Sequence, residues 1–136
     1  MPRRDKGKGP VDMTVYPVDD RWKPYRSGPP QATTFDLFGA KVEHRQWWDG
    51  KQLTDFVLTL QAERGDTEES IWEDVLRVDC CHREVHAHRL YLPDPNDVYR
   101  VITPIETPED LWEGADLAED LVYGEWQEHL RRWEGI

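Results

Sequence analysis

Apolar and polar residues alternate in short runs from about residue 35 onward, which is the pattern of half-buried β-strands. Two of these runs, 41–48 and 52–61, flank Asp49-Gly50, a dipeptide that tolerates the positive φ values of a type I′ turn. We therefore predict a β-hairpin. Its buried face carries the alternating apolar residues Phe56, Leu58, Leu60 and Ala62.

Turn residues separate three further strand-like runs, 70–81, 84–92 and 98–102. Gly65 marks the connection before the first of them, and a segment rich in proline, 93–96, precedes the last. The short connections favour neighbouring strands that run in opposite directions. We therefore predict an antiparallel meander sheet of about five strands.

A C-terminal helix begins near Thr107, where a hydroxyl at the cap position is followed by Pro108 at the first helical position. Apolar residues then recur at spacings of three, four or seven, and we expect this stripe to cover one face of the sheet. The stripe consists of Leu111, Ala115, Ala118, Val122, Trp126 and Trp133. Gly114 and Gly124 weaken the helix and mark positions for a kink or a break. The fold class that follows is α+β.

The N-terminal quarter of the chain has a different composition. Residues 1–34 contain six of the ten prolines and seven Lys or Arg against four Asp or Glu, and their apolar residues show no period. Such a segment buries too little apolar area to offset the entropy of ordering it. We predict an extended, basic, proline-rich tail over 1–34, disordered unless a partner holds it, and a single α+β domain over 35–136.

Charge and hydropathy exclude several classes of function. The net charge is −11, with +3 in the tail and −14 in the remainder, which argues against nonspecific binding to a phosphate backbone. An acidic body with a basic arm suits a protein partner, although acidity that only keeps the domain soluble is the alternative. No apolar run approaches the roughly twenty residues that a membrane-spanning helix needs. We expect a cytoplasmic protein that does not enter a membrane.

Reactive side chains gather in the predicted hairpin of runs 70–81 and 84–92. If a loop of two or four residues is centred on His82-Arg83, Asp79 lies opposite His86 and can hydrogen-bond its imidazole. One face is then apolar and meets the helix, with Leu76, Val78, Cys80, Val85, Ala87 and Tyr91. The other is polar, with Arg77, Asp79, Cys81, Glu84, His86 and His88. A loop of three or five residues would slip the register by one residue and separate Asp79 from His86.

Two kinds of chemistry fit the polar face. In the first, His86 and His88 bind a divalent metal ion such as zinc, and Cys81, His82 or Asp79 completes the site. In the second, His86 and His82 act as acid and base, Asp79 orients them, and His88 assists or binds a metal. Cleavage of RNA through its 2′-hydroxyl needs little more than this and a cation on the phosphate, for which the candidates are Arg77, Arg83 and Arg89. A solvent-exposed hairpin without chemistry is the alternative to both.

The segment Val78-Asp79-Cys80-Cys81-His82-Arg83, with His86-Ala87-His88 after it, resembles the Tyr-Asp-Asn-x-His-Gly and His-x-His signature of TumE-type toxins of prokaryotic toxin–antitoxin pairs. Related uncharacterised proteins on mobile elements share it. The resemblance covers about residues 56–133 and carries Asp79, His82, His86 and His88, whereas Val78, Cys80 and Arg83 depart from the signature. It implies a cytosolic toxin with an antitoxin partner.

Two functional hypotheses follow from the sequence. The first is a toxin-like, ribonuclease-like hydrolase that cleaves RNA phosphodiesters at the His/Asp site. The second is a noncatalytic interaction subunit of a phage, mobile-element or defence assembly, which binds a protein partner through its tail.

Overall fold

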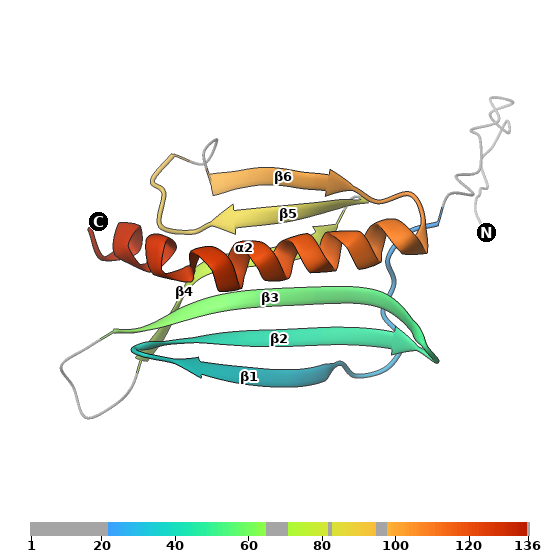
Figure 1. Ribbon diagram of the computed structural model, residues 1–136, viewed down its shortest axis with the longest axis horizontal. Helices are drawn as coiled ribbons and strands as arrows, with labels where there is room; N and C mark the ends of the chain where they lie inside the picture. The colour runs from blue at the N-terminus through green and yellow to red at the C-terminus, as the bar shows by residue number, and fades with distance from the viewer. Residues whose placement is uncertain (1–21, 65–70, 82, 95–97, 136) are drawn as a thin grey trace, which may run out of the picture.

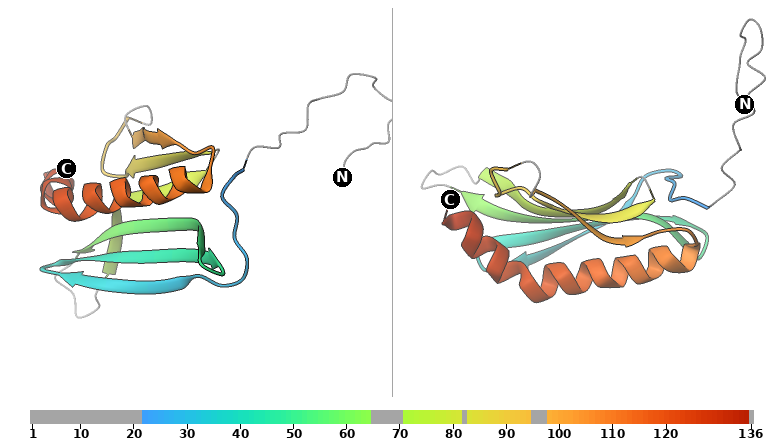
Figure 2. Two further views of the ribbon diagram at one scale, coloured as in Figure 1. Left: turned by 45° about the vertical axis from the view of Figure 1, so that its right-hand side comes forward. Right: turned by 90° about the horizontal axis from the view of Figure 1, so that it is seen from above.

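A computed structural model describes residues 22–64, 71–81, 83–94 and 98–135. Six strands of these residues form one sheet in which every strand pairs with its sequence neighbours in antiparallel fashion, in the order β1 to β6 (Figure 1). The strands are β1 (Gln31–Leu37), β2 (Ala40–Asp49), β3 (Gln52–Arg64), β4 (Ile71–Cys81), β5 (Glu84–Arg89) and β6 (Tyr99–Pro104). Helix α2 (Pro108–Glu134) crosses one face of the sheet (Figure 2). The predicted α+β meander packed against a C-terminal helix is confirmed.

The additional strand is β1, which begins within the segment predicted to be tail, 1–34, and ends in the predicted domain. Its residues are exposed except for the partly buried Leu37, so they show none of the alternation by which a half-buried strand is recognised. The residues before β1 also contact the sheet, since the Tyr25 amide donates to the Thr54 carbonyl (3.0 Å) and Arg26 forms an ion pair with Asp55 (2.7 Å). Residues 1–21 lie outside the described part of the chain.

The predicted hairpin at Asp49-Gly50 is present, with its turn one residue further on. Asp49 pairs with Gln52, so the two central residues are Gly50 and Lys51. Gly50 has a φ of 61°, and no positive φ is recorded for Lys51. A positive φ at the first central position alone is the pattern of a type II′ turn, not of the type I′ turn that the dipeptide predicts.

Helix α2 begins as the sequence predicts. The Thr107 side chain accepts a hydrogen bond from the Asp110 amide (3.1 Å), while the Asp110 carboxylate accepts one from the Thr107 amide (3.0 Å). This reciprocal capping satisfies backbone donors of the first turn. The helix continues to Glu134 without a break at Gly114 or Gly124. No helix in the described residues is both long enough and apolar enough to cross a membrane.

The core lies between α2 and the strands behind it. Apolar side chains from β2 to β5 and from one face of the helix are almost fully buried there; on the helix they are Leu111, Ala115, Ala118 and Val122. Gly114 is buried among them, and a Cβ atom at this position would lie 2.5 Å from the Val85 Cγ2 atom. Gly114 therefore allows the helix to approach β5 closely.

Replacing Gly114 with alanine tests this close approach. Because Val85 is β-branched and stiff, we expect Gly114→Ala to lower the free energy of unfolding by about 1–3 kcal/mol. Gly124→Ala is the matched control, since its Cβ would meet nothing within 4 Å. That substitution should raise stability by about 0.5–1 kcal/mol, the usual gain of alanine over glycine in a helix. Urea unfolding measures both, and equal effects of the two substitutions would contradict the packing described.

The C-terminal half of the helix is tied to the sheet by a buried hydrogen bond. Tyr91 Oη and His129 Nδ1 lie 2.8 Å apart, and both side chains are buried. Burial lowers the pKa of His129 below its ordinary value of 6.5, and nearby Glu125 opposes this shift only in part. His129 is therefore neutral in the folded protein at neutral pH.

This lowered pKa predicts loss of stability in mild acid. As the pH falls, the unfolded chain takes up a proton at His129 before the folded protein does. The contribution of His129 is fully present above the unfolded-state pKa, about 6.5, and is lost as the pH falls from there through the folded-state pKa. Urea unfolding of the wild type and of His129→Gln at about pH 7.5 and about pH 5.5 measures this contribution. The variant should lose less stability than the wild type; an equal loss would exclude His129 as a cause.

Candidate functional site

The hairpin of β4 and β5 has the register expected for a loop of two or four residues. Cys80 pairs with Val85, Asp79 with His86, and Arg77 with His88. Cys81 pairs with Glu84, which leaves a loop of two residues. Its second residue, Arg83, has a φ of 62°, a conformation that tight hairpin turns require and that non-glycine residues adopt infrequently.

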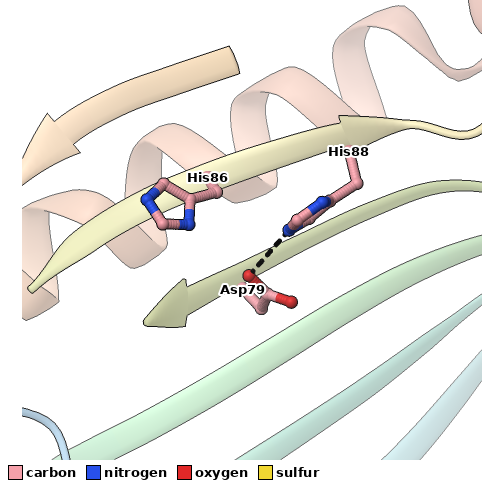
Figure 3. Close-up of side chains that lie close together, drawn as sticks. All are labelled: Asp79, His86 and His88. Carbon is pink, nitrogen blue, oxygen red and sulfur yellow. Dashed lines mark hydrogen bonds and ion pairs between the residues drawn. The ribbon is translucent and has the colours of Figure 1, made fainter. Parts of the chain in front are cut away.

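The two faces of this hairpin also divide as predicted. The six residues expected to face the helix are all buried. Asp79, His86 and His88 lie on the opposite face, and in Figure 3 helix α2 passes behind the two strands that carry them. The candidate site is therefore separated from the apolar core by the thickness of the sheet.

Three potential metal ligands converge on this face. Asp79, His86 and His88 each offer one ligand atom, and these atoms all lie within 4.8 Å of one another. His88 Nε2 and Asp79 Oδ1 are 3.2 Å apart. Within the described residues, no other group of three or more His, Cys, Asp or Glu side chains meets the same geometric condition.

The hydrogen bond predicted between Asp79 and His86 is formed with His88 instead. Figure 3 shows the imidazole of His88 reaching toward Asp79, whereas that of His86 points along its strand. His86 Nε2 lies 3.7 Å from a carboxylate oxygen of Glu84. His88 is the diagonal neighbour of Asp79 across the pair of strands, and a side chain as long as histidine spans that separation.

Burial differs sharply among the three ligands. The side chain of His86 is 0% exposed, whereas those of His88 and Asp79 are 18% and 19% exposed. Desolvation lowers the pKa of His86, an effect that the carboxylates of Glu84 and Asp79 oppose. The site therefore has a closed side formed by His86 and an open side formed by His88 and Asp79.

Arg77 places a cation at the open side of the site. Its Nε atom lies 3.2 Å from Asp79 Oδ2, on the same strand, and 39% of its side chain is exposed. A guanidinium has five N–H donors, and this contact uses the one at Nε. Arg77 thus contacts Asp79 and has further N–H donors that this contact does not use.

The remaining predicted site residues are Cys81, His82, Arg83 and Arg89. The side chain of Cys81 and all of His82 lie outside the described residues. Arg83 occupies the turn, where its carbonyl accepts a hydrogen bond from the Ile105 amide (2.7 Å). Arg89 pairs with the buried Leu76 and thus lies on the face of the sheet that carries the core, away from Asp79.

The structure adds a buried carboxylate that the sequence analysis did not single out. Asp55 is 6% exposed, and its Oδ1 atom lies 2.8 Å from the Cys80 thiol, which donates to it. Burial and the charge of Asp55 raise the pKa of Cys80. Cys80 is therefore a protonated core residue, consistent with the prediction from its position, and Asp55 anchors Arg26 on its other oxygen. The alternation of polar and apolar residues in β3 gives no signal for this role.

The donor set of the converging residues suits a transition-metal ion. Two imidazoles and one carboxylate are common ligands of zinc and of iron. Ligand atoms about 2.1 Å from a tetrahedral ion lie roughly 3.4 Å apart. The observed ligand atoms lie within 4.8 Å of one another, somewhat wider than around a bound ion.

No protein-family model, no curated protein and no solved structure matches this chain. The resemblance of residues 78–88 to the TumE-type toxins therefore stays a prediction. The chemistry of the site rests on its geometry.

Proposed function

We propose that Asp79, His86 and His88 bind a divalent transition-metal ion such as zinc, and that the bound ion supports cleavage of RNA phosphodiesters. The observation that carries the proposal is the convergence of the three ligand atoms within 4.8 Å of one another. The biological role that fits is that of a cytoplasmic toxin-like enzyme held in check by a protein partner, as the resemblance of residues 78–88 implies.

Burial favours the metal-based mechanism over a metal-free acid–base mechanism. A general acid or base must reach the proton that it transfers, within hydrogen-bond distance or through one water molecule. His86 is 0% exposed and does not reach a polymer that approaches from solvent. A metal ligand has no such requirement, because the ion itself contacts the substrate on the open side of the site.

Asp79, His86 and His88 would hold the ion through three ligand atoms and would leave room on it for water, as in catalytic zinc sites. An ion held there would supply a water of lowered pKa, which could act as the base toward the RNA 2′-hydroxyl. The 2′-oxygen then attacks phosphorus, the bond from phosphorus to the 5′-oxygen breaks, and the 5′-oxygen takes up a proton. The products carry a 2′,3′-cyclic phosphate and a 5′-hydroxyl.

Arg77 has the position and chemistry for contact with the phosphate. Its guanidinium lies beside Asp79, and its side chain is 39% exposed. Guanidinium groups bind phosphate oxygens through two N–H donors at once. Such a contact also offsets part of the repulsion between RNA and a protein with a net charge of −11. We therefore propose that Arg77 positions the scissile phosphate.

Metal binding is the first prediction of this proposal. Titration calorimetry with zinc chloride on chelator-treated protein should show one ion bound per chain. His88→Gln and Asp79→Asn should abolish the binding, because each removes one of three ligands. Both side chains are partly exposed, so these variants should remain folded, as circular dichroism verifies.

Asp74→Asn is the matched control for metal binding. Asp74 lies on β4 as Asp79 does, but its carboxylate accepts a hydrogen bond from Gln61 (2.8 Å) on an exposed part of the sheet. This variant should bind zinc as the wild type does. Undiminished binding in folded His88→Gln would contradict the assignment of the site.

RNA cleavage is the second prediction. The zinc-loaded wild type should cut single-stranded RNA and leave 2′,3′-cyclic phosphate ends, and its expression should arrest growth. Arg77→Ala should retain zinc but cleave about 10 to 1,000 times more slowly, the usual range for loss of a group that stabilises transition-state charge. Zinc binding without RNA cleavage or growth arrest would refute the catalytic part of the proposal and favour the noncatalytic interaction subunit.

A further inference from the structure

Strand β1 leaves one edge of the sheet unpaired within the described residues. It pairs with β2 on one side only and lies at the end of the strand order, at the lower border of the sheet in Figure 1. Six of its seven residues are exposed. A strand edge of this kind presents backbone N–H and C=O groups to any chain that can extend the sheet.

The two edges of the sheet differ in how they are protected. Proteins block unwanted pairing with charged side chains, lysine above all, and with proline on an edge strand. The edge strand β6 contains Arg100 and ends at Pro104. Strand β1 has the sequence Gln-Ala-Thr-Thr-Phe-Asp-Leu, with neither a basic residue nor proline and with Asp36 as its one charge. β1 is therefore the edge of the two that is suited to pairing.

We propose that two copies of this chain pair through β1, in antiparallel fashion around a two-fold axis, and so join two sheets into one. The register that uses all seven residues centres on Thr34, which then faces Thr34 of the second copy. This register places Gln31 opposite Leu37, Ala32 opposite Asp36, and Thr33 opposite Phe35. No two like charges meet.

The side chains on β1 support a second copy as the occupant. Phe35 is 45% exposed although one edge of its ring packs on Tyr123, with centroids 5.8 Å apart. In the proposed register, the two Phe35 rings are diagonal neighbours across the new strand pair, a separation that aromatic side chains span. Dimerisation therefore covers the exposed aromatic surface of both copies.

A closed dimer is favoured over an open chain of copies. Pairing of β1 with β6 of the next copy would repeat from copy to copy and generate a ring or a filament. Arg100 and Pro104 on β6 oppose that arrangement, whereas pairing of β1 with itself uses both unprotected edges and closes. A seven-residue strand pair is a small interface, so we expect a dimer that forms as the protein concentration rises.

This inference does not depend on the metal site. Asp79, His86 and His88 lie on β4 and β5, and strands β2 and β3 separate them from β1. Failure of either proposal therefore leaves the other standing.

Sedimentation equilibrium of the full chain over a concentration series tests the dimer. The wild type should approach about twice the monomer mass of 16.1 kDa. Thr34→Lys should stay monomeric, because two lysines would face each other across the two-fold axis. The variant should remain folded, because within each chain the lysine lies opposite Glu43, a residue of opposite charge. Thr34→Val is the matched control and should dimerise as the wild type does.

A charge exchange completes the test. Thr34→Glu alone should be monomeric, and an equal mixture of Thr34→Lys and Thr34→Glu should regain the dimer mass because opposite charges then meet. Val101→Lys on β6 should leave the dimer unchanged. A wild type that stays monomeric at its highest soluble concentration, a folded Thr34→Lys that still dimerises, or a mixture that stays monomeric would overturn the proposal.

Discussion

The register between β4 and β5 is the constraint on which the candidate site depends. Side chains alternate between the two faces of a sheet, so a slip of one residue would move Asp79 to a position opposite one of the core residues of β5. The two-residue turn that fixes this register requires a positive φ at Arg83, a conformation that costs roughly 1–2 kcal/mol in a non-glycine residue. The paired strands on either side of the turn hold that conformation in place.

The apolar face of the same strands gives the polar face its rigidity. Val85 and Ala87 alternate with His86 and His88 along β5, and both pack into the core beneath α2. Gly114 lets the helix approach β5 at Val85, directly behind the site. Any shift of β5 would therefore disturb the packing of Val85 and Ala87 in the core. This packing holds the backbone of His86 and His88 in a fixed position, as a metal site requires.

The parts of the fold that depend on residues close together in the sequence could be predicted from it. The parts that could not be predicted depend on exposed strands or on contacts between distant residues. The start of α2 and the register of β4 with β5 depend on short-range chemistry. The cap at Thr107 was predicted, and the observed register is the one expected for a short loop with an even number of residues. Strand β1 is exposed apart from the partly buried Leu37 and shows no regular alternation in its sequence. The hydrogen bond between Asp79 and His88 joins diagonal neighbours on two strands and depends on the length of the histidine side chain. The burial of Asp55 depends on contacts with Arg26 and Cys80, which are distant from it in sequence. Alternation along a single strand carries none of this information.

The central claim is that three side chains from two paired strands bind one metal ion. Anomalous diffraction at the zinc absorption edge, from crystals grown with zinc, tests it most directly. The account predicts a single strong anomalous peak within bonding distance of Asp79, His86 and His88, on the face of the sheet opposite α2. A zinc-containing crystal whose strong peaks all lie elsewhere, with the two imidazoles turned away from each other, would contradict it.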